Sequence, residues 1–352
     1  MSKRILFYLV AIITAVNFYS CREEINSPPI ESVAVEGAYL LSEGGFTPGS
    51  SKLSFYNLSG SSFIENIFNP ATLGLLPDGL VYFDKQLYLT EQGNFPSPGK
   101  IYNLDSNGTI KQSQPVGNSP YSLAIANEKI YITNGPANNI SVLNRNNLTA
   151  VTIINVGLYP QEIISIGNKI FVCNTSVFGG GTDSTVSVID AVTDQVVANI
   201  VVRKKPSSLA VTNDGNLLVG CPGDAVEGII YKINSNTYAK LDSFIISSGF
   251  AIGFDKDIAV SWNNEEIYFI SSLNNIVKLN LSTKLHSVFI PNTNTAVNFF
   301  YGYNYDSRRQ KHYVGNAKDF RSNGNFEIYD ANGTNTNTFV AGLFPRRIVI
   351  KN

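Results

Sequence analysis

The sequence is poor in the side chains that bind metals and haem. Only two of its 352 residues are histidines and only three are cysteines. It contains no CxxC pair, no CxxCH motif for covalent haem attachment and no Cys/His cluster with the spacing of a zinc site. A metal centre in this chain would therefore need oxygen ligands, and we expect neither a metal nor a cofactor.

Charge is also scarce. Charged residues make up 15% of the chain, and the formal net charge is −1. No basic block follows a phosphate backbone, so nucleic acid is not an expected partner. The sequence also lacks a Gly-rich phosphate loop and a Ser-centred nucleophile elbow. These absences exclude the commonest classes of nucleotide-dependent enzyme and of serine hydrolase.

The N-terminus has the features of an export signal. Lys3 and Arg4 precede the apolar run Ile5 to Val16, which is 12 residues long. A membrane-spanning helix needs about 20 apolar residues, so residues 1–20 are predicted to be a cleaved signal peptide. Their removal takes away two cations and no anion, which changes the net charge from −1 to −3.

Cys21 follows this signal directly behind Ser20. It resembles the lipidated cysteine of bacterial lipoproteins, and Glu23-Glu24 resembles the acidic signal that exports such proteins to the cell surface in Bacteroidetes. The resemblance implies an outer-membrane anchor through Cys21, with the surface as the expected location and the periplasmic face as the alternative. An ordinary signal peptide with a chance cysteine is the other reading. Residues 21–36 are then a flexible stalk, and residues 37–352 a single domain.

Look-alike segments fill that domain. Each begins with a proline-led apolar stretch, followed by a turn, an Ile-Tyr-Ile-like stretch and two further strands. The leading residues Pro77, Pro120, Pro160 and Pro206 are 43, 40 and 46 residues apart. A period of about 40–50 residues with several short strands per unit is typical of a β-propeller.

The ends of the chain complete the count. Further units begin near Gly249 and Thr295, which makes six complete blades of four antiparallel strands. The N-terminal piece offers three strands only, at 37–42, 52–57 and 62–68, whereas the last residues offer one, opened by Pro345. We predict an all-β, seven-bladed propeller whose C-terminal strand joins the N-terminal blade and closes the ring, since closure removes open sheet edges.

The two faces of such a ring differ. The loops between second and third strands are long and lie on the same face as the links between blades; we call it the loop face, and the opposite one the turn face. Aromatic residues and glycines on long loops over a rigid scaffold indicate binding; the alternative is that these aromatics fill gaps between blades. The candidate ligand-binding residues are Phe46, Phe95, Tyr121, Tyr159, Phe178, Asp183, Lys318, Asp319, Phe320, Arg321 and Arg346.

The first and last blades carry a family resemblance. The segments 37–44, 53–56 and 301–306, and above all His312 to Gly324 with 327–333, resemble the YVTN/YncE-like (DUF5074-like) propeller surface lipoproteins of Bacteroidetes. This resemblance covers nearly the whole mature chain. Related surface propellers cap vitamin B12 transporters and capture corrinoids on their loop face. The resemblance therefore implies ligand capture, although Asn316 stands where an Asp is more usual in that motif.

Catalysis has weaker support. His286 is expected near a turn on the turn face and His312 inside a strand, so both are interpreted as structural. Five loop-face carboxylates would have to meet at the axis to form a Ca²⁺ or lactonase-like centre: Glu43, Glu91, Asp183, Asp224 and Asp319. Cys173 and Cys221 are interpreted as buried small residues, with a disulfide as the alternative.

The leading hypothesis is a non-catalytic, lipid-anchored propeller that captures a small molecule for an outer-membrane transporter. Corrinoids are the sharpest candidate, because stacking and amide hydrogen bonds suit a large amphipathic ring. The alternatives are an adhesion scaffold that binds protein or glycan, and a lactonase-like metal-dependent hydrolase.

Overall fold

The computed structural model describes residues 35–69, 76–94, 97–176, 181–222, 227–253 and 255–351. The predicted signal peptide, Cys21 and most of the stalk lie outside these residues, as do Phe95, Phe178 and Asp224. The chain from Val35 onward forms one unit. In this described part, no helix has the length and apolar character needed to cross a membrane.

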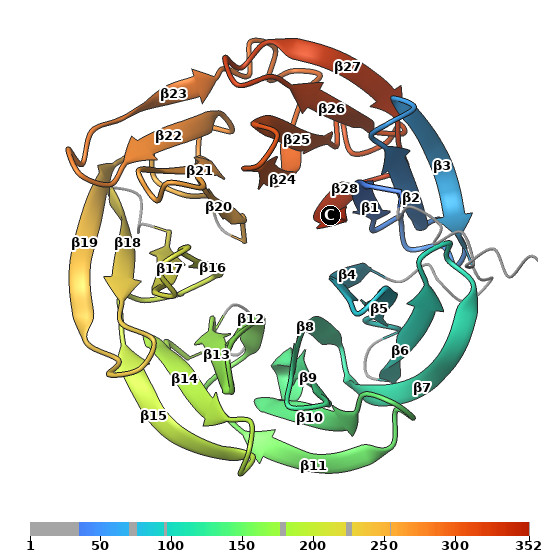
Figure 1. The fold of residues 1–352 in the computed structure, drawn as a ribbon, viewed down its shortest axis with the longest axis vertical. Helices are drawn as coiled ribbons and strands as arrows, with labels where there is room; N and C mark the ends of the chain where they lie inside the picture. The colour runs from blue at the N-terminus through green and yellow to red at the C-terminus, as the bar shows by residue number, and fades with distance from the viewer. Residues whose placement is uncertain are drawn as a thin grey trace, which may run out of the picture. The chain divides into compact units, whose positions relative to one another are not determined.

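The described strands form seven four-stranded antiparallel sheets arranged as blades around a central axis (Figure 1). Written from the innermost strand outward, blade 1 consists of Pro345–Lys351 (β28), Gly37–Ser42 (β1), Lys52–Asn57 (β2) and Ser62–Phe68 (β3). Blade 2 consists of Pro77–Phe83 (β4), Gln86–Glu91 (β5), Pro98–Asp105 (β6) and Ile110–Asn118 (β7). Blade 3 consists of Pro120–Ala126 (β8), Lys129–Asn134 (β9), Asn139–Asn144 (β10) and Ala150–Asn155 (β11), with a short 3₁₀ turn at Gly135–Ala137 (η1).

The remaining four blades repeat this order. Blade 4 consists of Pro160–Ile166 (β12), Lys169–Asn174 (β13), Thr185–Asp190 (β14) and Gln195–Val201 (β15). Blade 5 consists of Ser208–Val211 (β16), Leu217–Cys221 (β17), Glu227–Ile233 (β18) and Lys240–Ser247 (β19). Blade 6 consists of Ile258–Val260 (β20), Glu266–Ile270 (β21), Ile276–Asn280 (β22) and His286–Ile290 (β23), and blade 7 of Phe300–Asp306 (β24), Lys311–Asn316 (β25), Asn325–Tyr329 (β26) and Asn335–Val340 (β27).

The burial of the strands follows from their place in a blade. The second strand of blade 3, β9, is buried at every residue but its first, because its sheet packs against blades on both sides. The outermost strand, β11, is exposed at every residue but one. The apolar side chains of such middle strands thus pack against the neighbouring blades, and the core is a series of layers between adjacent blades.

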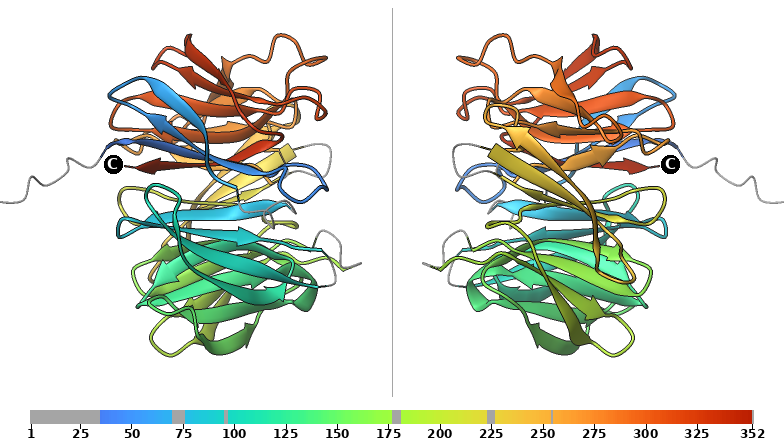
Figure 2. Two further views of the ribbon diagram at one scale, coloured as in Figure 1. Left: turned by 90° about the vertical axis from the view of Figure 1, so that its right-hand side faces the viewer. Right: turned by 90° about the vertical axis from the view of Figure 1, so that its left-hand side faces the viewer.

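The ring closes as predicted. β28 pairs antiparallel with β1, from Gly37 opposite Lys351 to Ser42 opposite Pro345. The first described strand begins and the last one ends on the turn face, away from the β1–β2 loop (Figure 2). Glu36 is already tied to the ring, since its carbonyl accepts the amide of Leu58 at 3.0 Å and its carboxylate pairs with Arg309.

Several inner strands begin with a bulge that determines where their side chains point. In β4, Pro77 lies opposite Glu91 and Leu80 opposite Leu89, so the inner strand holds one extra residue. β8 and β12 repeat this offset after Pro120 and Pro160, and β28 has it at Arg346. A bulge breaks the strict alternation of a strand and re-aims its side chains, so neighbouring residues after the proline both turn toward the axis.

Side-chain hydrogen bonds join blades 2 to 6 each to the start of the inner strand of the next blade, near the loop face. The donor is a Thr, Ser or Asn and the acceptor a backbone carbonyl: Thr90 to Tyr121 (3.1 Å), Thr133 to Gln161 (2.8 Å), Thr175 to Pro206 (2.8 Å), Ser208 to Lys256 (2.5 Å) and Asn274 to Phe300 (2.8 Å). These bonds fix the inner strands relative to one another, so side chains at their starts have defined separations across the axis.

Two sequence-based boundaries differ from the structure. The inner strands of blades 6 and 7 begin at Ile258 and Phe300, several residues after the predicted starts near Gly249 and Thr295. No proline marks these starts, and residues 249–253 form a turn with an isolated bridge from Ile252 to Ser271. Cys173 and Cys221 are free and buried, which confirms their interpretation as small core residues.

The closing strand should carry a measurable part of the stability. Ile348 in β28 is 3% exposed and packs into the layer between blades 7 and 1, whereas Val340 in β27 is 57% exposed. We expect Ile348→Ala to lower the free energy of unfolding by about 2–5 kcal/mol, because it leaves a cavity. The control Val340→Ala should change it by no more than about 0.5 kcal/mol. Urea denaturation measures both; equal small effects would contradict closure by β28.

Candidate functional site

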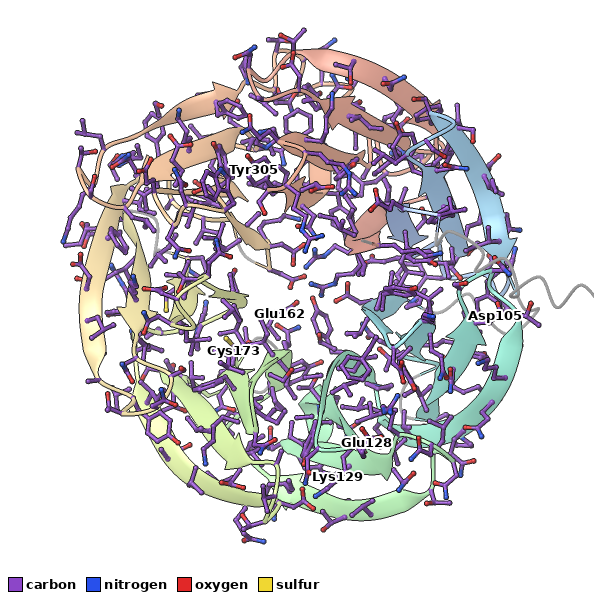
Figure 3. All side chains as sticks on the ribbon, viewed as in Figure 1. Asp105, Glu128, Lys129, Glu162, Cys173 and Tyr305 are labelled. Atoms are coloured by element: carbon purple, nitrogen blue, oxygen red, sulfur yellow. The ribbon has the colours of Figure 1, made fainter. Side chains whose placement is uncertain are left out.

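Charged side chains and one tyrosine, from blades that are far apart in sequence, meet at the axis near the loop face. They follow the bulged starts of the inner strands or precede β20. We call this group the axial cluster: Asp78, Tyr121, Glu162, Asp255, Asp257, Arg346 and Arg347. Figure 3 shows one member, Glu162, near the centre of the ring.

Arg346 is the most deeply buried member of the axial cluster, with 1% of its side chain exposed. Its Nη1 donates to Asp257 Oδ2 at 2.7 Å. Its Nη2 donates to the backbone carbonyl of Asp255 at 2.9 Å and to Asp255 Oδ1 at 3.3 Å. A guanidinium loses its hydration when buried, so these charge-assisted bonds offset that loss.

Arg347 extends the network to two further blades. Its Nη2 donates to Glu162 Oε1 of blade 4 at 2.6 Å and to Asp78 Oδ2 of blade 2 at 3.0 Å. Its Nη1 donates to Asp257 Oδ1 at 2.7 Å. The two arginines of the C-terminal strand therefore bind acidic groups of blades 2, 4 and 6 across the ring.

A second set of contacts leads from the axial cluster toward blades 7 and 1. Tyr121 Oη donates to Asp255 Oδ1 at 2.5 Å. Lys256 Nζ donates to the carbonyl of Tyr301 at 3.2 Å and lies 4.3 Å from the centre of the Tyr301 ring, a cation–π contact. Tyr301 Oη in turn donates to Glu43 Oε2 at 2.8 Å.

Acidic groups outnumber cationic ones here. The carboxylates are Glu43, Asp78, Glu162, Asp255 and Asp257, and the cations are Lys256, Arg346 and Arg347. Desolvation raises the pKa of Glu43 to about 8, with Asp78 adding to the rise, and raises that of Glu162 to about 7. When both glutamates are protonated, three charged carboxylates remain beside three cations, and the charge of the group is balanced.

The other groups divide according to their nearest partners. Burial also raises the pKa of Asp255. For Asp257 burial acts in the same direction, but Arg346 and Arg347 outweigh it, so its pKa is lowered. Desolvation and the neighbouring Arg346 lower the pKa of Lys256 to about 8. The site thus holds several groups that titrate near neutral pH, as functional sites often do.

Beside the axial cluster lies a group of aromatic side chains that we call the aromatic platform: Phe299, Tyr301, Phe320 and Phe344. Phe320 is central, with its ring centroid 4.8 Å from Phe299, 5.7 Å from Tyr301 and 5.5 Å from Phe344. It is also 40% exposed. The platform therefore presents an aromatic surface to solvent on the loop face of blades 7 and 1.

The backbone of the platform is strained. Phe320 has φ of 57° and Phe344 has φ of 54°. Bulky residues rarely adopt this left-handed conformation. At Phe344 it belongs to the repeat, because the residues before the other leading prolines also have positive φ: Leu76, Ser119, Tyr159 and Lys205. Phe320 lies outside that pattern. Asp319 helps to hold the loop, since its Oδ1 accepts the amides of Arg321 at 3.0 Å and Ser322 at 2.8 Å.

The structure brings together three of the predicted binding residues. Tyr121 and Arg346 belong to the axial cluster, and Phe320 forms the aromatic platform. Phe46 is 83% exposed at the β1–β2 loop. Lys318 and Arg321 lie in the same loop as Phe320.

Three other predicted residues have local roles. Asp319 caps its own loop, and hydrogen bonds from Ser322 lower its pKa to about 2. Asp183 accepts the amide of Leu158 at 2.9 Å and the hydroxyl of Thr185 at 2.6 Å. The ring of Tyr159 lies against Gly135, where a Cβ would come within 2.6 Å of it. These contacts are structural, and the residues do not meet the axial cluster.

The carboxylates considered for a hydrolytic centre do not converge. Of those described, only Glu43 reaches the axial cluster; Glu91 accepts the hydroxyl of Tyr102 at 2.9 Å in blade 2. Among the described residues, no group of three or more His, Cys, Asp or Glu side chains has the arrangement of a metal site. His312 is buried, lies 2.7 Å from Tyr303 Oη, and has its pKa lowered by burial to about 3, which confirms its structural role.

Sequence analysis missed most of the axial cluster. Asp78, Glu162 and Arg347 stand one or two positions after the repeated prolines, so the signal was present in Pro77-Asp78, Pro160-Gln161-Glu162 and Pro345-Arg346-Arg347. Asp255 and Asp257 precede a strand without a leading proline and offered no such signal. Phe299 and Phe344 lie in links between blades, where the prediction named only the aromatics Tyr121 and Tyr159.

A cavity of about 200 Å³ lies on the axis beyond the axial cluster. Arg347, Glu162 and Asp257 form one end, and residues further along the inner strands form the walls. The axis therefore carries a charged layer near the loop face and a separate hollow below it.

These features define a class of protein: a seven-bladed β-propeller with a buried ionic cluster on its axis and an aromatic surface on its loop face. The chain belongs to the family described as "Domain of unknown function (DUF5074)", whose profile matches residues 36–340. No curated protein is similar enough to count as a match.

Solved structures with the same fold are distant in sequence. A quinonprotein alcohol dehydrogenase-like protein from Bacteroides thetaiotaomicron is 16% identical with a TM-score of 0.69, over 89% of this chain and 78% of that one. Hydrazine synthase from Kuenenia stuttgartiensis is 14% identical with a TM-score of 0.61, over 75% and 85%. The dihydro-heme d1 dehydrogenase NirN, in complex with DHE, is 11% identical with a TM-score of 0.56, over 89% and 74%. At these identities the likeness shows the fold alone.

Removal of one arginine from the axial cluster should destabilise the ring in a pH-dependent way. Arg347→Met leaves Asp78, Glu162 and Asp257 without their shared cation, and breaking a buried ion pair costs about 3–5 kcal/mol. We expect this loss in the free energy of unfolding at neutral pH, and a smaller loss as acid neutralises the carboxylates. The exposed Arg321→Met is the matched control. A loss that does not depend on pH would contradict the network.

Glu43 should make stability fall as the pH rises. Its pKa in the folded state is about 8, above its ordinary value of 4.5, so the folded form binds the proton more tightly. The resulting stability is complete below pH 4.5 and is lost as the pH rises through 8. Thermal unfolding should therefore show Glu43→Gln gaining stability relative to the wild type over this interval. The exposed Glu265→Gln should show no such trend.

Proposed function

We propose that this chain is a non-catalytic propeller that captures a ligand on its loop face. The observation that carries the proposal is the aromatic platform: three aromatic side chains around an exposed Phe320, which itself has a left-handed backbone. Packing alone does not require a bulky aromatic with φ of 57° to remain 40% exposed. Strain and exposure together favour a surface that is preorganised for a partner.

The chemistry of the surface favours a large, flat ligand with polar edges. The exposed face of Phe320 offers stacking, and the exposed Arg321 in the same loop offers hydrogen-bond donors. A corrinoid has this character, since its ring stacks on aromatics and its amide side groups exchange hydrogen bonds. A corrinoid such as vitamin B12 is therefore the ligand that we propose.

The proposed setting is the outer membrane. Lipid on Cys21 would tether the propeller to the membrane through the stalk, with the cell surface as its location. A ligand captured there would be passed to an outer-membrane transporter, which is the proposed partner. The support is the N-terminal sequence, with its charged start, short apolar run and cysteine.

Calorimetry tests the ligand. The chain from residue 26 onward, which contains all of the described propeller, would be titrated with cyanocobalamin and its precursor cobinamide. We expect one-to-one binding that Phe320→Ala weakens by at least about tenfold, because stacking on an aromatic contributes about 1–3 kcal/mol.

Trp262→Ala is the matched control. Trp262 is a more exposed aromatic, at 62% against 40% for Phe320, but it lies in the β20–β21 turn on the opposite face. It should bind both corrinoids as the unchanged chain does. No heat with either corrinoid would remove the corrinoid proposal, and equal losses in both variants would remove the loop-face site.

A further inference from the structure

Two cations share the loop that carries Phe320. Lys318 stands two residues before it and Arg321 directly after it, and Lys318 is half-buried whereas Arg321 is exposed. In the part of the chain that the structure describes, neither side chain is paired with a carboxylate. Two cations beside an exposed aromatic ring are therefore available to a partner outside the chain.

The loop is held by its own hydrogen bonds. The amide of Ala317 donates to the carbonyl of Phe299 at 2.8 Å, and the amide of Lys318 donates to Asn316 Oδ1 at 3.0 Å. The amide of Phe320 donates to the carbonyl of Ala317 at 3.1 Å. Lys318 and Phe320 both have positive φ, at 52° and 57°. This strained and bonded backbone fixes the points from which the aromatic ring and the cations leave the loop.

The one carboxylate of this loop is directed back into it. Asp319 Oδ1 accepts the amides of Arg321 and Ser322 and also the hydroxyl of Ser322, at 2.8 Å. The axial cluster below is balanced in charge when Glu43 and Glu162 carry protons. Two unpaired cations against one engaged carboxylate therefore make the surface around the platform positive.

The neighbouring blade adds an apolar, uncharged surface. The amide of Glu43 donates to the carbonyl of Phe344 at 3.0 Å, so the β1–β2 loop is bound to the platform. Beyond Glu43, residues 44–51 of this loop contain no charge. Phe46 in this loop is 83% exposed. The loop face thus combines an apolar part on blade 1 with cations on blade 7.

We propose that the captured ligand is a flat macrocycle that carries an anionic group at its edge. The ring lies on Phe320, and Lys318 and Arg321 bind the anion. Guanidinium and ammonium groups recognise carboxylates and phosphates by charge-assisted hydrogen bonds. This inference rests on the proposed capture at the platform and deepens it. Among corrinoids, those that carry a phosphate or free carboxylates should bind more tightly than those whose side groups are all amides.

Two porphyrins of similar size and opposite charge test the preference. The chain from residue 26 onward would be titrated at neutral pH with meso-tetrakis(carboxyphenyl)porphyrin and with meso-tetrakis(N-methylpyridyl)porphyrin, followed by the absorption band of the porphyrin. We expect the anionic porphyrin to bind at least about tenfold more tightly at low salt. Added salt should narrow the difference, because the cations lie near the surface. Equal binding, tighter binding of the cationic porphyrin, or no binding of the anionic one would overturn the proposal.

Three variants locate the preference, each checked for folding by thermal unfolding. Lys318→Gln combined with Arg321→Gln keeps the aromatic ring and should remove the preference for the anionic porphyrin. Phe320→Ala should instead weaken both porphyrins by the same factor, about tenfold. Lys204→Gln combined with Lys205→Gln is the control, because these exposed cations lie in the link between blades 4 and 5, also on the loop face.

The outcomes separate this inference from the proposed function. A preference that survives in the first double variant, or that is lost in the control, would overturn anion binding by the Phe320 loop. If both porphyrins bind equally and Phe320→Ala weakens both, capture at the platform stands and only the selection of an anion fails. The calorimetry with corrinoids tests the proposed function independently of this result.

Discussion

The propeller depends on the two arginines that its last strand brings to the axis. Arg346 and Arg347 are adjacent in sequence, and the bulge at the start of β28 allows both to turn inward. Between them they bind acidic groups from blades 2, 4 and 6. The strand that closes the ring by backbone pairing with β1 thus also neutralises carboxylates at its centre. The same strand therefore both closes the ring and neutralises the carboxylates at the axis.

The same arrangement separates two environments along the axis. On the loop-face side, Lys256 and Tyr301 connect the axial cluster to Glu43 and to the aromatic platform. On the other side, Glu162 and Asp257 line the cavity. Because carboxylates exceed cations, protons on Glu43 and Glu162 balance the charge near neutral pH. The axial cluster thus contacts the aromatic platform on one side and lines the axial cavity on the other.

The fold was predictable because its information is local and repeated. Proline-led segments at Pro77, Pro120 and Pro160 each predict an inner strand, and Pro345 at the end predicts the strand missing from the first blade. The site was only partly predictable. Tyr121 and Arg346 were found because the links between blades bring them to the loop face, and Phe320 because it lies in a long loop. The meeting of blades 2, 4, 6 and 1 at the axis depends on ring geometry, and no pattern in the sequence states which residues face one another across it.

Hydrogen exchange with and without cobinamide would examine the proposed capture surface without any mutation. If the loop face is the binding surface, protection should rise in residues 299–301, 317–323 and 341–344, which carry the aromatic platform and its supporting loop. The turns between first and second strands on the opposite face, such as residues 261–265, should exchange as before. Protection confined to the turn face, or none at saturating cobinamide, would contradict capture by the aromatic platform.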